Sequence, residues 1–265
     1  MKTTLLAAIA AIGLSLTAGI AAAETVRVGI AAEPYPPFTE PDANGNWKGW
    51  EIDFMNAVCA EAKLDCVVTP VAWDGIIPAL QAKQFDLIWS SMSITDERKK
   101  TIDFSDMYYN TPTMVIGAKD GDMDITPDHL KGKLLGVQVS TTHERYAQKF
   151  FGAAGAEIKT YATQDEANND LAAGRLDYVQ ADASALDAFL QTDQGMACCE
   201  SKGMVPHDSE TLGEGVGAGI RKDDTALKEK INGAIAALAA AGKFEEITSK
   251  YPELVGKMIT PGGGK

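Results

Sequence analysis

Short apolar segments alternate with amphipathic segments along the chain from residue 25 onwards. Residues 25–30 have the alternation of a strand, and the apolar residues of segment 52–59 recur at the spacing of one helical face. The repeated change between the two patterns predicts an α/β fold with a mostly parallel sheet. Further strands are expected at 66–71, 85–89, 113–117, 134–138, 157–161 and 175–180, and further helices near residues 73–80, 95–98, 142–144, 164–173 and 225–241.

The pattern divides into two similar units, and each has a cluster of hydroxyl side chains where a strand meets a helix. The clusters lie at residues 90–95 in the first unit and at residues 140–142 in the second. Ligands of open α/β sheets gather at the carboxyl ends of the strands. Two lobes that face each other would therefore place both clusters on a single cleft.

The first cluster continues into a segment with the composition of an anion site. Thr95 is predicted to cap a helix at its N-terminus, which makes Arg98 the third helical residue. Hydroxyls, free backbone N–H groups and a guanidinium would then converge, and a guanidinium can bind a carboxylate through two parallel hydrogen bonds. The alternative is that Arg98 is a surface residue paired with Asp96 or Asp103. These residues alone do not decide between the two interpretations.

The first 23 residues have the pattern of a secretory signal peptide. Lys2 precedes the apolar stretch 5–20, and alanines at 21–23 provide small residues for cleavage before Glu24. No later stretch is long and apolar enough to span a bilayer, so we expect an exported, soluble protein.

The mature chain is strongly acidic. Because Lys2 is one of the 24 basic side chains, 23 remain against 37 acidic ones, a net charge of −14. Such a charge opposes binding to nucleic acids and anionic membranes, and it mildly favours small cationic ligands through long-range attraction.

The four cysteines form two pairs in the sequence. Cys59 and Cys66 lie seven residues apart, at the end of a predicted helix and the start of a strand, which predicts a disulfide in an oxidising compartment. Cys198 and Cys199 are adjacent. They could form a disulfide with each other, bond to another molecule or remain thiols.

The sequence lacks the motifs of the common catalytic and nucleotide-binding sites. Neither Ser93 nor Ser140 lies in a Gly-x-Ser-x-Gly motif, and no histidine is evidently placed to activate either one. No phosphate-binding glycine motif follows a strand. Histidines and cysteines do not occur at the spacing of a metal site, so no metal or other cofactor is expected. The candidate residues that remain are binding groups: arginine, hydroxyls, an aromatic ring and isolated acids.

With the export signal, these features resemble those of the polar amino acid-binding proteins of ABC importers, in particular the group that binds lysine/arginine/ornithine, histidine and opines. The resemblance covers nearly all of the mature chain. The segments that carry it are specific together, although each is weak alone: 35–38 (YPPF), 49–53 (GWEID), 73–80 (WDGIIPAL), 90–98 (SSMSITDER), 172–177 (AAGRLD) and 219–224 (GIRKDD).

The resemblance implies a type II periplasmic binding protein fold, with two α/β lobes that close around a ligand by hinge motion. Residues 24–110 and 214–256 would form the first lobe and residues 113–210 the second, with crossings near 110–113 and 210–215. Residues 257–265 would be a disordered tail. The protein would be a periplasmic monomer whose partners are an amino acid and the permease subunits of an ABC transporter at the inner membrane.

The resemblance also implies which residues hold the ligand's head group. Arg98 would bind the α-carboxylate, with help from Ser93 and the backbone near Thr142. Ser91 and Asp182 would receive the α-ammonium group. Three further residues of the two clusters complete the predicted head-group site: Ser90, Met92 and Thr141.

The expected side-chain site departs from the family pattern. Trp73 would stack on the ligand side chain, unless it packs in the core, and Tyr35 would cover the other side. Cationic binders place an acid near the end of the first strand, where this chain offers Ala31, Ala32 or Glu33, depending on the alignment. Glu33 would hold a basic side chain, whereas Ala32 at that position would leave no charged partner.

A second departure is Ser140, which stands in the predicted ligand-binding loop where the family usually has glycine. The predicted ligand is a basic amino acid, arginine first, followed by ornithine, lysine or an opine. The alternatives are another polar amino acid, or an enzyme on the same fold that resembles cyclohexadienyl dehydratase.

Overall fold

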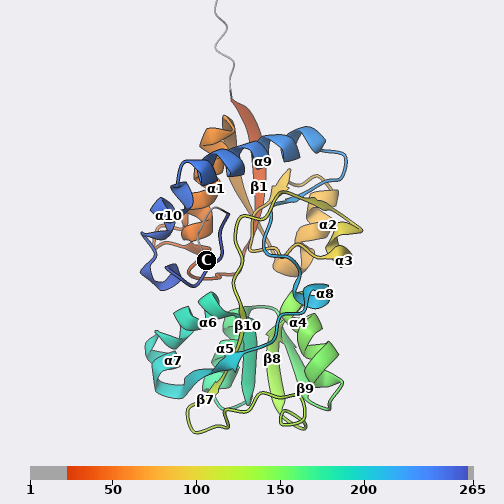
Figure 1. Ribbon diagram of the computed structural model, residues 1–265, viewed down its shortest axis with the longest axis vertical. Helices are drawn as coiled ribbons and strands as arrows, with labels where there is room; N and C mark the ends of the chain where they lie inside the picture. The colour runs from red at the N-terminus through yellow and green to blue at the C-terminus, as the bar shows by residue number, and fades with distance from the viewer. Residues whose placement is uncertain (1–22, 262–265) are drawn as a thin grey trace, which may run out of the picture.

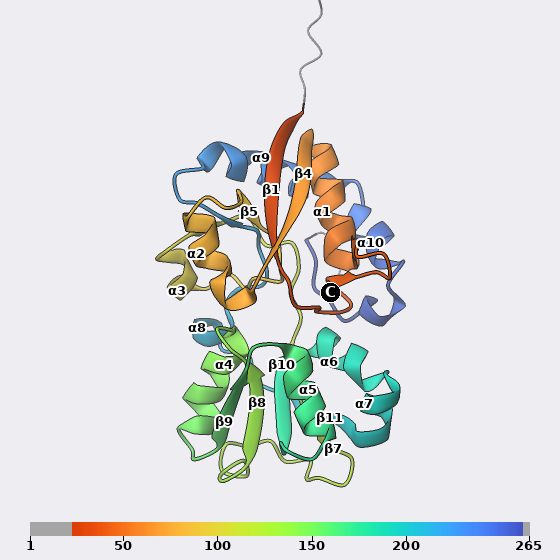
Figure 2. The same ribbon diagram turned by 180° about the vertical axis from the view of Figure 1, so that it is seen from behind.

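The computed structural model describes residues 23–261. The predicted signal peptide, residues 1–23, therefore lies outside the described residues except for Ala23. The described chain forms two lobes, one above the other along the long axis (Figure 1). The upper lobe contains the first and last parts of residues 23–261 and the lower lobe the middle part, and the view from behind shows the same division (Figure 2). The predicted two-lobed α/β fold is thereby confirmed.

The first lobe is built on a five-stranded sheet. Its strands run in the order β4 (Leu64–Val71), β1 (Glu24–Ala31), β5 (Leu87–Ile88), β12 (Gly219–Ile220) and β6 (Asp103–Phe104). The other elements of this lobe are β2 (Glu40–Pro41), β3 (Trp47–Lys48), α1 (Trp50–Glu61), η1 (Trp73–Gly75), α2 (Ile76–Gln81), α3 (Asp96–Lys99), α9 (Thr225–Ala240), α10 (Lys243–Thr248) and η3 (Pro252–Leu254).

The second lobe also has a five-stranded sheet with helices around it. Its strands run in the order β11 (Cys199–Met204), β7 (Thr113–Ala118), β10 (Tyr178–Asp182), β8 (Leu134–Gln138) and β9 (Glu157–Tyr161). Its helical elements are α4 (Thr142–Tyr146), η2 (Ala147–Gly152), α5 (Gln164–Ala172), α6 (Ala183–Leu190), α7 (Asp193–Cys198) and α8 (Ser209–Leu212).

Each sheet is covered on both faces. Along β7, Met114 and Ile116 belong to the core cluster on one face of the sheet, and Val115 belongs to the cluster on the other. In the first lobe, Leu87 and Ile88 likewise point into two different clusters. Burial on both faces explains why several strands are continuous apolar runs rather than alternating ones.

Each sheet is mostly parallel, as predicted: four of its five strands point the same way and one strand is reversed. β1 pairs in parallel with β4 and β5, but β12 runs antiparallel to both of its neighbours. In the second lobe, β7 runs antiparallel to β10 and β11. The reason is the path of the chain: β7 and β12 each follow a crossing between the lobes, so they enter their sheets from the edge where the parallel strands end.

The second crossing is fixed at a glycine. Gly213 follows α8 with a φ of +82°, and a Cβ at this position would lie 2.3 Å from the carbonyl oxygen of Ile94. Both the left-handed backbone and the close approach therefore require glycine here. The next residue, Glu214, donates its N–H to the same Ile94 carbonyl at 2.9 Å, which ties the crossing to the loop before α3.

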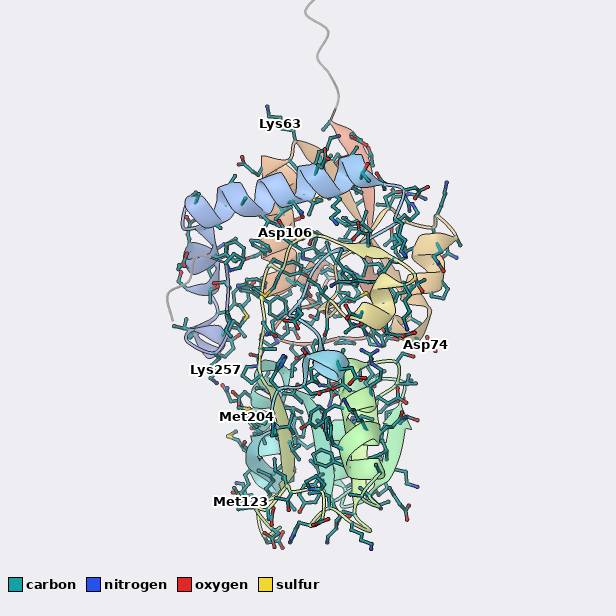
Figure 3. All side chains as sticks on the ribbon, turned by 45° about the vertical axis from the view of Figure 1, so that its right-hand side comes forward. Lys63, Asp74, Asp106, Met123, Met204 and Lys257 are labelled. Carbon is teal, nitrogen blue, oxygen red and sulfur yellow. A yellow bond between two sulfur atoms is a disulfide. The ribbon has the colours of Figure 1, made fainter. Side chains whose placement is uncertain are left out.

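Residues 257–261 are not the disordered segment that was expected. Ile259 and Asn110 exchange backbone hydrogen bonds of 2.8 and 2.9 Å beside the first crossing. Lys257, labelled in Figure 3 at the level where the lobes meet, places its Nζ 2.6 Å from an Asp187 oxygen of the second lobe. These contacts offset the conformational entropy that residues 257–261 lose when they become ordered. The glycine-rich end of the sequence had suggested that this loss would keep the segment disordered.

Both cysteine pairs form disulfides. Cys59 at the end of α1 is bonded to Cys66 of β4, as predicted, with 6.1 Å between the Cα atoms. Cys198 and Cys199 are bonded to each other, which is one of the three alternatives that their adjacency left open. Within residues 23–261, no helix is both long and apolar enough to cross a membrane.

Replacing Cys59 and Cys66 together by alanine is expected to lower the free energy of unfolding by about 2 kcal/mol, because the unfolded chain loses a cross-link. Urea denaturation would measure the change. The matched control replaces Cys198 and Cys199 by alanine. Neighbouring cysteines enclose almost no loop, so this control should lose less stability. An equal loss in the two variants would contradict the loop-closure argument.

Candidate functional site

A cleft of about 540 Å³, open solvent included, lies between the two lobes. It collects residues from strand ends and from the loops that follow them, as the two hydroxyl clusters predict. The first lobe contributes Ala31, Glu33, Pro34, Tyr35, Trp73, Ser90, Ser91, Ser93 and Arg98, and the second contributes Gln138, Thr141, Thr142, His143, Gln164 and Asp182.

Arg98 is placed on the cleft by the capped start of α3. The Thr95 hydroxyl accepts a hydrogen bond from the Arg98 N–H at 3.2 Å, which confirms the predicted cap. The guanidinium donates to the carbonyl oxygens of Ser93 at 2.9 Å and Ser140 at 3.2 Å, and it lies 5.4 Å from the centre of the Trp73 ring. Burial, followed by the nearby charge of Arg145, lowers the pKa of Arg98 to about 9, so the group stays cationic at pH 7.

The alternative surface interpretation of Arg98 is wrong. Asp96 lies 3.6 Å from the Nζ of Lys99, and Asp103 lies 2.8 Å from the Nζ of Lys228. In the part of the chain that the structure describes, no carboxylate forms an ion pair with Arg98. Its charge is therefore available to an anion in the cleft.

Direct hydrogen bonds join the two walls of the cleft. Tyr35 donates its hydroxyl to Asp182 at 2.7 Å, and the Trp73 indole N–H donates to the Val139 carbonyl at 3.1 Å. The bond from Arg98 to the Ser140 carbonyl also crosses between the lobes. The structure is therefore a closed arrangement of the lobes.

The serine cluster of the first lobe divides between cleft and core. Ser91 and Ser93 line the cleft. Ser90 also reaches it, but its hydroxyl accepts a hydrogen bond from the Ala31 N–H at 2.9 Å and so ties β1 to the serine loop. Met92 does not line the cleft: it is 1% exposed and packs in a core cluster, because its side chain points to the opposite side of the loop.

In the second lobe, Thr141 and Thr142 line the cleft and Ser140 does not. Thr141 caps α4, accepting from the Glu144 N–H at 3.1 Å, and the Thr142 hydroxyl lies 3.4 Å from that of Ser93. Ser140 has a φ of +61° and contributes its carbonyl to Arg98 rather than a side chain to the cleft. Glycine would adopt this left-handed backbone with less strain than serine does.

Asp182 is placed by the sheet of the second lobe. It is the last residue of β10 and pairs with Thr113, the first residue of β7, so it lies at the edge that faces the cleft. Its carboxylate accepts the Tyr35 hydroxyl and lies 3.5 Å from the Nε2 of His143. The wall opposite Arg98 therefore carries a negative charge.

Glu33, and not Ala32, faces the cleft. Both Glu33 oxygens lie within reach of the Trp73 backbone N–H, at 3.1 and 3.3 Å, so the carboxylate caps the turn that begins at Trp73. Ala32 is exposed and does not line the cleft, whereas Ala31 does. The carboxylate and the indole ring thus lie together on the first-lobe wall. That either contacts a ligand stays a prediction.

Five residues that line the cleft were not predicted from the sequence to bind a ligand. One of them is Ala31, which had been considered only as one possible alignment of the first loop. Gln138 ends β8, so the rule that ligands gather at strand ends could have found it. Gln164 opens α5, is 5% exposed and donates to Asn168 at 2.9 Å, but no sequence signal distinguishes it from a surface glutamine. The remaining ones are Pro34 and His143.

The groups that line the cleft can bind a small polar molecule through charges and hydrogen bonds. Among residues 23–261, no group of three or more histidine, cysteine and acidic side chains is arranged to hold a metal ion. His143 is 7% exposed, and its ring nitrogens face Asp182 at 3.5 Å and the Thr113 hydroxyl at 3.4 Å, neither of which is a serine nucleophile. What the walls offer is a cation, two carboxylates, hydroxyls and an aromatic face.

Comparison with known proteins finds relatives that are named for binding amino acids. The L-arginine-binding protein of Pseudomonas aeruginosa is 44% identical over 251 residues, which is 94% of this chain and 96% of that protein. The lysine/arginine/ornithine-binding periplasmic protein of Escherichia coli is 38% identical over 254 residues, 95% of this chain and 97% of that protein. The structure of an ancestral arginine-binding protein bound to arginine matches with a TM-score of 0.79 at 33% identity, covering 87% of this chain and 99% of that one.

The sequence profile of one family, the bacterial extracellular solute-binding proteins of family 3, matches residues 26–253. This range includes every residue that lines the cleft and both sheets except the first two residues of β1. The chain therefore belongs to the bacterial extracellular solute-binding proteins of family 3.

Proposed function

We propose that the protein captures a free basic amino acid, arginine foremost, and presents it to an ABC transporter for uptake. The observation that carries this proposal is the pair of charges on opposite walls of the cleft. Arg98 has no carboxylate partner and Asp182 has no lysine or arginine partner among the described residues. An α-amino acid carries an anion and a cation one carbon apart, so its head group would neutralise both.

The two ends of the head group would bind by different means. The guanidinium of Arg98 offers a planar pair of donors to the α-carboxylate, with Ser93 and Thr142 beside it. Asp182 and the hydroxyls of Ser91 and Tyr35 would receive the α-ammonium group. This clamp would hold any α-amino acid, so it does not by itself choose the side chain.

Glu33 and Trp73 support a cationic side chain. Glu33 faces the cleft without a lysine or arginine partner in the described chain, and the Trp73 ring presents a surface that attracts cations. The similar proteins named for arginine, or for lysine, arginine and ornithine, agree with this choice. Arginine is the first candidate because its flat guanidinium can both stack on the ring and pair with a carboxylate; ornithine, lysine and opines follow.

The proposal includes the setting in which the protein acts. The signal-peptide pattern of residues 1–23 and the bonded cysteines support a periplasmic location. Closure of the lobes around the ligand would create the form that docks on the permease at the inner membrane. We propose that it acts as a monomer, and the net charge of the mature chain supports a role without nucleic acid.

Arg98→Ala is expected to weaken the binding of L-arginine at least about 30-fold, because a desolvated carboxylate would lose its charged partner. Isothermal titration would measure the dissociation constant. Arg98→Lys is the matched variant: it keeps the charge without the planar fork, so its affinity should fall between those of the wild type and the alanine variant. Unchanged affinity in Arg98→Ala would show that the carboxylate binds elsewhere.

Glu33→Gln is expected to reduce the affinity for L-arginine about tenfold or more and to leave the affinity for L-glutamine nearly unchanged. Glutamine can still accept the Trp73 N–H, so the variant removes the charge and keeps the local geometry. Glu61→Gln, which changes the same charge at an exposed position at the end of α1, is the control and should bind arginine normally. Tighter binding of neutral amino acids by the wild type would favour the alternative of a different polar ligand.

Incubation with prephenate or arogenate is expected to give no product, because His143, which lines the cleft, faces Asp182 and the Thr113 hydroxyl and is not paired with a serine hydroxyl. Absorbance of the aromatic products would detect turnover, and thermal melting would detect binding alone. Turnover that is lost in Asp182→Asn would favour the dehydratase-like enzyme.

A further inference from the structure

A carboxylate with no exposed surface lies beneath the floor of the cleft. Glu51, the second residue of α1, is 0% exposed. It accepts hydrogen bonds from the Ser91 N–H at 2.7 Å, from the Ser91 hydroxyl at 2.9 Å and from the Tyr108 hydroxyl. Burial raises the pKa of Glu51, and these hydrogen bonds act in the opposite direction, in favour of the ionised form.

The surroundings of Glu51 are fixed by aromatic packing rather than by the cleft. The ring of Tyr108 stacks on that of Trp89, with 4.5 Å between the ring centres and an angle of 13° between the planes. Phe54 of α1 packs against the same two rings. Buried rings of this size have little freedom, so the Tyr108 hydroxyl and the Glu51 carboxylate are held in place before any ligand arrives.

The bond from Ser91 to Glu51 decides what Ser91 can offer a ligand. A serine hydroxyl has one hydrogen, and here it is donated to Glu51. The lone pairs of the Ser91 oxygen remain, so on the cleft side it can accept a hydrogen bond but cannot donate one. Tyr35 is in the same state, because its hydrogen is donated to Asp182. Three groups that line the cleft, Ser91, Tyr35 and Asp182, are therefore acceptors.

We propose that Glu51 is a positioning residue that acts through Ser91 and restricts this part of the cleft to ligands with an α-ammonium group. An ammonium group only donates hydrogen bonds, so it matches a site of acceptors. An analogue without the amino group would leave those acceptors without partners. The inference rests on the proposed function, since it assigns the source of selectivity within the same head-group site.

The test compares L-arginine with its des-amino analogue, 5-guanidinopentanoate, by isothermal titration against the wild type and Glu51→Gln. The new amide can donate to the Ser91 oxygen, which turns the serine hydrogen towards the cleft. We expect the affinity for L-arginine to fall about tenfold or more and that for the analogue to change less than about twofold. A purely structural defect would weaken both ligands alike and would overturn the proposal.

Ser91→Gly separates the action through Ser91 from a direct effect of the Glu51 charge. Glycine accepts the φ of +48° that Ser91 adopts, and the substitution removes the hydroxymethyl side chain that carries the hydrogen bond to Glu51. This variant should lose most of the preference for L-arginine over the analogue, and adding Glu51→Gln to it should change the preference less than about twofold. If the two substitutions reduced the preference independently and additively, Glu51 would act directly by its charge and not through Ser91. The proposal would then be wrong.

Asp182→Asn distinguishes failure of this inference from failure of the proposed function. If Asp182→Asn abolishes the preference for L-arginine and Glu51→Gln leaves it intact, the ammonium site stands and the role of Glu51 is wrong. If the wild type binds both ligands equally, the ammonium site and this inference are both overturned. Circular dichroism checks folding; if Glu51→Gln does not fold, Ser91→Gly decides alone, and a preserved preference refutes the proposal.

Discussion

The cleft is arranged around the guanidinium of Arg98, which forms no ion pair with a carboxylate of the described residues. The guanidinium of Arg98 is held by two backbone carbonyls, one from Ser93 in the first lobe and one from Ser140 in the second. Carbonyl dipoles and the nearby Trp73 ring offset only part of a full charge that has been withdrawn from water. Because one of the two carbonyls belongs to the opposite lobe, the placement of Arg98 depends on closure, and under the proposed function an anion bound there would stabilise the closed form.

The two walls of the cleft contain the same local backbone arrangement. Ser91 follows β5 and Ser140 follows β8, and both have a left-handed backbone, which is uncommon for residues other than glycine. In each case the serine N–H donates to a glutamate carboxylate, that of Glu51 at 2.7 Å and that of Glu144 at 2.6 Å. The lobes differ in where this carboxylate lies. Glu51 is fully buried and Glu144 is partly exposed, so water screens the Glu51 carboxylate less than that of Glu144.

Features that depend on neighbours in sequence could be predicted, and features that depend on the path of the chain could not. The cap at Thr95 and the position of Arg98 follow from a short local pattern, and the structure has both. The direction of β12 depends on where the chain re-enters the sheet, which no local pattern records. Glu33 lies in a proline-rich loop without periodicity, so the sequence could not tell whether it or Ala32 faces the cleft. Gln164 was missed because nothing in its local sequence indicates that it lines the cleft.

The position of β12 has a consequence for the order in which the chain folds. Residues 219–220 form an inner strand of the first sheet, between β5 and β6, yet they follow the whole second lobe in the sequence. The second sheet, by contrast, is made from one continuous stretch between β7 and β11. Pairing across a long unfolded loop is slow because the closure entropy must be overcome before any contact rewards it. A second lobe that has already become compact shortens that loop. We therefore expect the middle of the chain to fold before β12 pairs with β5 and β6.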